Sequence, residues 1–223
     1  MHVMSAPLDP ADRGSVELAA RALSEGSVVA VPTDTVYGLA AALDRPEAIE
    51  RLFELKGRPS DVPCAVLVAG PDQLATITGR LGPLASQLAR RFWPGPLTLV
   101  VARSKDFEVD LGGPPEARST VGVRWPDDRL VGELARLSGP VAATSANLHG
   151  EPPAETAAEV RRAFDGDERL ALVLDGGTCH GVPSTVVDCT GETLRCLRDG
   201  AVSWAEVVGE VQSGPSAGGT GDR

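Results

Sequence analysis

The sequence contains few aromatic residues and no long apolar run. Phe, Trp and Tyr make up 4% of its 223 residues, whereas surfaces that stack single-stranded bases need clustered aromatic side chains. No apolar stretch approaches the roughly 20 residues that a membrane-spanning helix needs. The first residues, MHVMSAPLDPADRG, lack the basic and then apolar pattern of a signal peptide. These absences predict a soluble cytoplasmic protein that neither enters a membrane nor stacks bases on its surface.

Charge and cysteine usage count against two further classes. The 31 acidic and 21 basic residues give a net charge of -10, and a general nucleic-acid coat needs clustered Lys and Arg to neutralise phosphates. A local basic pocket remains compatible with this balance. The four cysteines include no CxxC pair, and a chain of this length does not need disulfide staples, which suits a reducing compartment.

Common nucleotide-binding and hydrolase signatures are also missing. The chain has no GxxxxGK[ST] loop, no GxGxxG fingerprint and no GxSxG elbow. Its three histidines, His2, His149 and His180, have no second cluster of ligands in the sequence, so we do not expect a zinc site. What remains is a set of Lys, Arg, Thr, Ser and Asn side chains. Such a set suits phosphoryl or nucleotidyl transfer, in which positioning and charge stabilisation do most of the work.

Strand-like and helix-like segments alternate along the chain and predict an α/β fold with a mixed sheet. We expect helices over residues 15–26, 46–57, 81–93, 127–139, 155–164 and 203–211. We expect strands over residues 27–32, 65–69, 97–102, 119–125, 140–144, 169–177, 184–189 and 193–198. The predicted organisation is an N-terminal extension (1–14), one domain (15–208) and a flexible Gly/Ser-rich tail (209–223).

Polar side chains gather where predicted strands end. Thr33 and Thr35 follow the strand over 27–32 and should share a side, with Asp34 opposite. Asp34 could hold Mg²⁺ or cap a turn, and capping is the preferred interpretation. Ser145 and Asn147, also two residues apart, could bind phosphate or sugar oxygens without adding charge. An ordinary polar turn would show the same residues.

The segment KGRPSD places two cations beside a glycine. Pro59 disfavours a helical conformation at Arg58, so Lys56 and Arg58 can project together from an extended chain and clamp a phosphate. The alternative, favoured when this segment is considered alone because Lys and Arg at helix ends are often structural, is a helix C-terminus whose cations interact with the helix dipole. Ser184 and Arg198, at a strand start and before a turn, could be site residues or structural ones.

Seven segments in order make the chain similar to the YrdC/TsaC family of L-threonylcarbamoyladenylate synthases. They are PTDTVYGL, KGRP, PGPLT, VGVRWP, SAN, STVVD and LRDG, within residues 15–208. The resemblance implies a YrdC-like twisted sheet of parallel and antiparallel strands, flanked by helices, with a concave and positively charged cavity. It also implies a nucleotidyltransferase that forms L-threonylcarbamoyl-AMP and pyrophosphate from L-threonine, bicarbonate and ATP, the first step of tRNA t6A37 modification. The chain resembles the short, single-domain form of the family.

The resemblance assigns roles to residues at matching positions. The phosphates of ATP and the reacting centre would be held by Lys56, Arg58, Ser145 and Asn147. Other parts of ATP would be bound by Thr120 and Arg198. L-threonine would be bound by Thr35, Arg124 and Ser184, in a pocket shaped by Thr33 and Tyr37. Mg²⁺ would arrive with the ATP phosphates, and no tightly bound organic cofactor is expected.

Two residues depart from the family pattern, and two alternative functions stay open. Cys64 stands where Leu often follows the proline, and Leu67 lies near a position where some members carry a substrate-contacting His. One alternative is a relative that forms a carbamoyl adenylate from carbamoyl phosphate. The other is a non-catalytic module for double-stranded RNA or tRNA, against which the acidic balance counts. A downstream tRNA-modifying complex is a candidate partner, and the oligomeric state is open.

Overall fold

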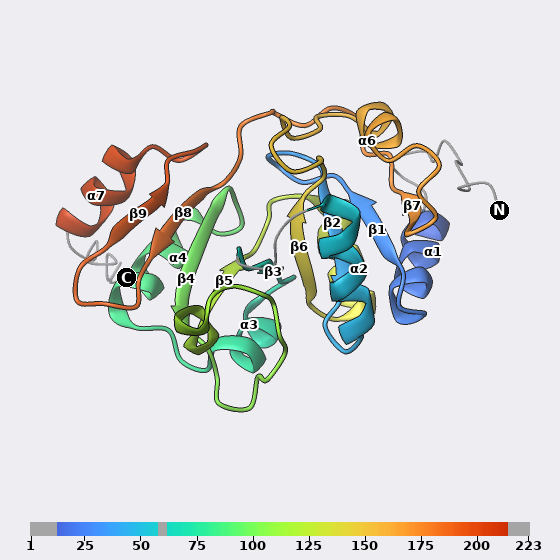
Figure 1. Cartoon of the computed structure of the whole chain (residues 1–223). Coiled ribbons are helices and arrows are strands. Elements are labelled where there is room, and N and C mark those ends of the chain that lie inside the picture. The colour runs from blue at the N-terminus through green and yellow to red at the C-terminus, as the bar shows by residue number, and fades with distance from the viewer. Residues whose placement is uncertain (1–12, 58–61, 214–223) are drawn as a thin grey trace, which may run out of the picture.

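The architecture is a single mixed sheet with helices on its faces, as Figure 1 shows for a computed structural model of the chain. The structure describes residues 13–57 and 62–213. Within them the strands are β1 (Val28–Val31), β2 (Gly38–Ala42), β3 (Ala65–Leu67), β4 (Leu97–Ala102), β5 (Thr120–Arg124), β6 (Val141–Ser145), β7 (Leu170–Val173), β8 (Thr185–Asp188) and β9 (Arg195–Arg198). The helices are α1 (Arg13–Ser24), α2 (Pro46–Lys56), α3 (Pro71–Thr78), α4 (Pro83–Phe92), η1 (Pro115–Ser119, a 3-10 turn), α5 (Arg129–Ser138), α6 (Ala157–Ala163) and α7 (Trp204–Gln212).

The strand order is β7-β1-β2-β6-β3-β5-β4-β8-β9. Parallel pairs join β1 to β7, β3 to β5 and β4 to β8, and the remaining neighbours are antiparallel. This arrangement confirms the predicted α/β class with a mixed sheet. No helix of the described residues is long and apolar enough to cross a membrane.

Three elements, β2, α3 and the 3-10 turn η1, were not predicted, and α7 crosses a predicted boundary. Strand β2 is the sequence GLAAA, which lacks the β-branched and aromatic residues that mark strands, although all five residues are buried. Helix α3 is only eight residues long and contains β-branched Thr and Ile. Helix α7 continues to Gln212, past the expected domain end at 208. Short or small-residue elements therefore carry too little local signal to be found from sequence.

One half of the sheet is covered on both faces. Because successive strand residues point to opposite faces, Val29 and Val31 of β1 join an apolar cluster with α1 and α5, whereas Val28 and Ala30 join the cluster that contains α2. Helices α1 and α5 also pack against each other. This half of the domain is an ordinary two-sided core.

Within the described part of the chain, the other half of the sheet is covered by helices on one face only. In β4, Leu97, Leu99 and Val101 belong to the core, while Thr98 and Val100 between them face a cavity. Strand β5 repeats the pattern, with Val121 and Val123 in the core. The open face continues the face that α1 and α5 cover, since Leu67 and Ala143 belong both to their cluster and to the cavity wall.

The connection from β7 to β8 spans nearly the whole width of the sheet. Strand β7 is one edge and β8 lies next to the other edge, so residues 174–184, here called the crossover segment, pass over the sheet (orange in Figure 1). The Tyr37 hydroxyl accepts a hydrogen bond from the N–H of Gly176 (3.1 Å) and donates one to the carbonyl of Gly177 (2.9 Å). Gly181 N–H donates to the carbonyl of Thr35 (2.9 Å). The crossover segment is thus tied to the turn between β1 and β2.

Candidate active site

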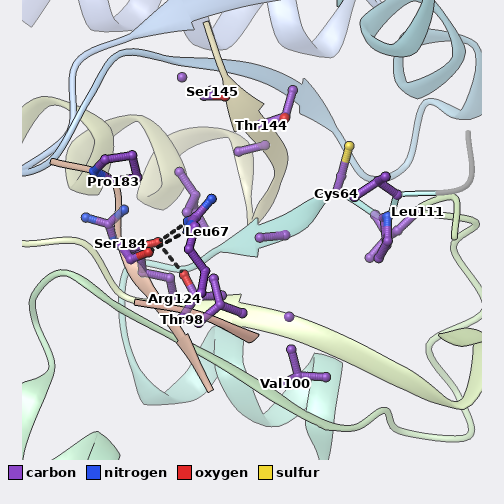
Figure 2. A pocket seen from close by; sticks show the side chains of 18 of the residues that line it. Cys64, Leu67, Thr98, Val100, Leu111, Arg124, Thr144, Ser145, Pro183 and Ser184 are labelled. Atoms are coloured by element: carbon purple, nitrogen blue, oxygen red, sulfur yellow. Dashed lines mark hydrogen bonds between the residues drawn. The ribbon is translucent and has the colours of Figure 1, made fainter. Parts of the chain in front are cut away.

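The open face of the sheet forms the floor of a cavity of about 470 Å³. Its walls come from the β1–β2 turn, the crossover segment, the end of β6 and the chain around Leu111, as Figure 2 shows in part. The charged side chains among its described lining residues are three arginines, Arg103, Arg124 and Arg198, and none of these described lining residues is Asp or Glu. The cavity therefore offers positive groups and hydroxyls to a ligand.

Arg124 lies at the floor with only 5% of its surface exposed. Its Nε donates to the carbonyl of Gly95 (3.1 Å), Nη1 to Thr35 Oγ1 (2.9 Å) and Nη2 to Asp34 Oδ1 (2.5 Å). Burial lowers the pKa of Arg124 from its usual range, and the charge of Asp34 opposes that shift. A guanidinium carries five N–H donors, so donors beyond these three bonds are available to a ligand carboxylate.

The prediction that Asp34 caps the turn is wrong. Its carboxylate pairs with Arg124, and its second oxygen, Oδ2, is buried without a hydrogen-bond partner in the described part of the chain. The turn is closed by Thr33 instead, whose Oγ1 accepts from the N–H groups of Thr35 (3.1 Å) and Val36 (3.2 Å). Thr33 Oγ1 and Thr35 Oγ1 lie 2.9 Å apart, so the two hydroxyls share a side as expected. Both residues line the cavity, whereas Asp34 does not.

A second group of hydroxyls lies where the crossover segment enters β8. Ser184 Oγ is 2.9 Å from Thr98 Oγ1 and accepts a hydrogen bond from Arg198 Nη2 (2.9 Å), as the dashed lines near Ser184 in Figure 2 show. Arg198 Nε also donates to the carbonyl of Ser184 (2.8 Å). Gly200 permits this approach, because a Cβ there would lie 2.4 Å from the carbonyl oxygen of Pro183.

The end of β6 carries the third group. Ser145 lines the cavity, and the Lys56 ammonium donates to its hydroxyl (3.1 Å) and its carbonyl (2.7 Å). Lys56 also donates to the carbonyl (3.2 Å) and the side-chain Oδ1 (2.9 Å) of Asn147, whose Nδ2 donates to the carbonyls of Leu148 and Glu151. Lys56 and Asn147 are buried behind Ser145 and are not among the residues that line the cavity. Arg58 lies outside the described residues.

The remaining predicted residues lie around the cavity with different roles for their polar atoms. Thr120 lines it and donates its hydroxyl to the carbonyl of Ala117 (3.1 Å). Tyr37 lines it too, but its hydroxyl binds the crossover segment, and burial raises its pKa to about 12. Cys64 and Leu67, the two departures from the family pattern, both contribute to the wall.

Sequence inspection missed several lining residues. Thr98 and Gly122 occupy alternate positions of strands that were predicted, so the period-two pattern of LTLVVA and TVGVR could have indicated them. Arg103 and Leu111 approach the cavity from loops and carry no such signal. Within the described ranges, no three or more His, Cys, Asp or Glu side chains are grouped to hold a metal ion.

The chain is similar to known proteins both in sequence and in structure. A model of the Sua5/YciO/YrdC family, described as "Telomere recombination", matches residues 21–200. A threonylcarbamoyl-AMP synthase of Pyrococcus abyssi is 41% identical over 90% of this chain, which covers 59% of that relative's own length. A putative threonylcarbamoyl-AMP synthase of Mycobacterium tuberculosis is 39% identical over 90% of this chain and 93% of its own. The crystal structure of P. abyssi Sua5 complexed with L-threonine is similar with a TM-score of 0.81, 39% identity and coverage of 88% of this chain and 57% of that one.

Proposed function

The chain belongs to the Sua5/YciO/YrdC family, and we propose that it is a threonylcarbamoyl-AMP synthase. The reaction would join L-threonine, bicarbonate and ATP into L-threonylcarbamoyl-AMP and pyrophosphate. Two relatives bear that activity in their names. One is longer than this chain, and the other is of nearly equal length. The proposed role in the cell is the first step of t6A modification at position 37 of tRNA.

The buried guanidinium of Arg124 carries the proposal. It is fixed on three sides by Gly95, Thr35 and Asp34, and a rigid guanidinium fork suits a carboxylate. Ser184 provides a hydroxyl on the same face of the sheet. We assign this end of the cavity to the carboxylate and hydroxyl of L-threonine, whose complex with the P. abyssi relative supports the assignment.

The proposed chemistry has two steps. The amine nitrogen of L-threonine attacks the carbon of bicarbonate, a C–N bond forms, and water leaves to give a carbamate. A carbamate oxygen then attacks the α-phosphorus of ATP, and the bond to the bridging oxygen of the β-phosphate breaks, which releases pyrophosphate. Positive charge and donors placed where negative charge develops would stabilise this second step. We assign that task to the Ser145 end of the cavity, with Lys56 and Arg58, and the binding of the nucleotide to Thr120 and Arg198.

Mg²⁺ would enter as part of the ATP substrate. A hard cation prefers carboxylate ligands, and the described lining of the cavity contains none, so the donor set does not fit a magnesium site held by the protein. The ion would shield the triphosphate charge, and no protein residue is assigned to it.

The product would be a reactive mixed anhydride of a carbamate and AMP. Its carbamoyl group must be transferred to the adenosine of tRNA by another activity, so a tRNA-modifying complex is the proposed downstream partner. The acidic balance of this chain gives no reason to expect strong nucleic-acid binding by the chain itself.

The test is a reaction of the purified chain with MgATP, L-threonine and labelled bicarbonate, followed by chromatography of nucleotides and pyrophosphate. We expect a labelled adenylate that requires threonine. Arg124→Gln should raise the KM for L-threonine by about 100-fold or more, because removing the charged partner of the substrate carboxylate costs roughly 3 kcal/mol of binding free energy. Arg129→Gln, a change at an exposed arginine of α5, is the matched control and should behave as wild type.

The other outcomes separate the alternatives. Bound ATP with no threonine-dependent product would contradict the synthase, and a labelled adenylate from carbamoyl phosphate would then support the carbamoyl-adenylate alternative. A salt-dependent gel shift of double-stranded RNA by a chain without turnover would support the binding module.

A further inference from the structure

The ammonium of Lys56 is enclosed by oxygen atoms of the protein. Four acceptors lie within 3.2 Å of Nζ, two from Ser145 and two from Asn147. An ammonium has three N–H donors, so the protein offers at least as many acceptors as Lys56 can use. Only 4% of the residue is exposed. The described residues alone can therefore accept all three N–H donors of Lys56.

The contact with Ser145 fixes the direction of one hydroxyl. Because Lys56 donates to Ser145 Oγ, the serine hydrogen must point away from the ammonium. Ser145 Oγ makes no other hydrogen bond with residues 13–57 or 62–213, and the residue lines the cavity (upper part of Figure 2). The hydroxyl is therefore available as a donor to a ligand, and the adjacent positive charge strengthens it as a donor.

We propose that Lys56 is a positioning residue, which acts on the substrate through Ser145 and does not contact it. Ser145 would donate to an anionic oxygen, and Lys56 would hold and polarise that donor from behind. The inference rests on the proposed function and refines it. The oxygen belongs either to a phosphate of ATP or to bicarbonate and its carbamate, since both are anionic and both must bind near the reacting centre.

A double-mutant cycle tests this mechanism. Ser145→Ala should lower kcat/KM by about 10- to 100-fold, the effect of one hydrogen bond to a charged group. Lys56→Met should lower it at least as much, and the double variant should be no worse than Lys56→Met, because both changes remove one donor. If Lys56 contacts the substrate itself, the two effects will multiply, which would overturn the proposal. Lys105→Met, a change at the other lysine of the sequence, is the control and should leave the effect of Ser145→Ala unchanged.

The kinetic constants show which oxygen is bound and test whether the variants disrupt the whole site. A higher KM for ATP in both single variants identifies a phosphate oxygen, and a higher KM for bicarbonate identifies the bicarbonate oxygen. The KM for L-threonine should stay unchanged, because Arg124 and Ser184 are intact. A matching rise in all three KM values would mean that Lys56 is merely structural, against the proposal.

Lysine acetylation of the wild-type chain gives a second test that needs no variant. Mass spectrometry should find Lys105, which is exposed, modified quickly, and Lys56 protected both with and without MgATP. Modification of Lys56 in the free protein, with protection only by MgATP, would show a direct ligand contact and overturn the proposal. This result stands whether or not the chain forms the adenylate, so it separates failure of this inference from failure of the proposed function.

Discussion

Three hydroxyls of the cavity each accept a hydrogen bond from a cation. Arg124 donates to Thr35, Arg198 to Ser184 and Lys56 to Ser145. Every one of these residues was selected from the sequence, yet the pairs were not. The partners lie 89, 14 and 89 positions apart, and local patterns report only on neighbours along the chain. Residue types at strand ends were therefore predictable, whereas their partners depended on the strand order.

The ion pair between Asp34 and Arg124 gives a prediction at this scale. Asp34→Ala leaves a buried guanidinium without its counter-charge, so the free energy of unfolding should fall by about 3 kcal/mol. Urea denaturation followed by circular dichroism measures this change. The KM for L-threonine should also rise, since Arg124 loses one of the groups that fix it.

A double variant provides the control. Replacing Arg124 by Met in the Asp34→Ala background removes the orphaned charge and should recover part of the lost stability. No recovery would mean that Asp34 stabilises the turn by itself, independently of Arg124.

Individual strands decide where the cavity lies. Apart from Val100, the alternate residues of β4 and β5 that face the cavity are small or polar, and those between them are apolar core residues. The alternation is visible in the sequence, but it is equally typical of a strand with one face in water. Only the neighbouring loops and the crossover segment turn that face into an enclosed site. The strands were predictable from local patterns, whereas the cavity was expected only from the family resemblance.

Gly122 provides a test at the level of the strand. A Cβ at this position would meet Thr98 and Ala65 at ordinary contact distances of 3.6 and 3.8 Å, so Gly122→Val should fold with unchanged or higher thermal stability. Its methyl groups would extend into the cavity and weaken ATP binding by about tenfold or more, which corresponds to roughly 1.4 kcal/mol of steric cost. Calorimetric titration and a thermal melt measure the two quantities.

Gly82→Val is the matched control for this change. Nothing lies within 4 Å of a Cβ at Gly82, and its backbone is extended. It should bind ATP as wild type does. Unimpaired binding by Gly122→Val would show that the ligand does not use this part of the cavity.

At the scale of the whole molecule, the succession of elements was largely predictable and their spatial order was not. Most helices and strands have strong signals, such as the Pro start and Gly end of α2. Strand order depends on long-range pairs, for example β7 beside β1 and β8 beside β4, which no local pattern encodes. The crossover segment looks like an ordinary Gly-rich loop in the sequence, although it joins the two ends of the sheet.

Burial of the Tyr37 phenol against the crossover segment makes stability depend on pH. Burial raises the pKa of Tyr37 to about 12, above the value near 10 of an unfolded chain. The folded state therefore favours the protonated phenol. Its contribution is complete below pH 10 and is lost as the pH rises toward 12.

Tyr37 is the single tyrosine of the sequence, so phenolate absorbance reports on it alone. We expect no ionisation near pH 10 in the folded protein, and a free energy of unfolding that decreases above that pH. Tyr37→Phe should lack this component of the pH dependence. An ionisation midpoint near pH 10 in the native protein would show that the hydroxyl is solvated and does not hold the crossover segment.

The long path of the chain across the sheet also has a consequence during translation. The cavity takes residues from Thr33 near one end of the domain to Arg198 near the other. While β8 and β9 are still being synthesised or lie inside the ribosome, the nascent chain exposes the β1–β2 turn but neither Ser184 nor Arg198. A ligand that needs both ends of the cavity can therefore bind only when synthesis of the domain is almost complete, and products terminated before β8 lack part of the site.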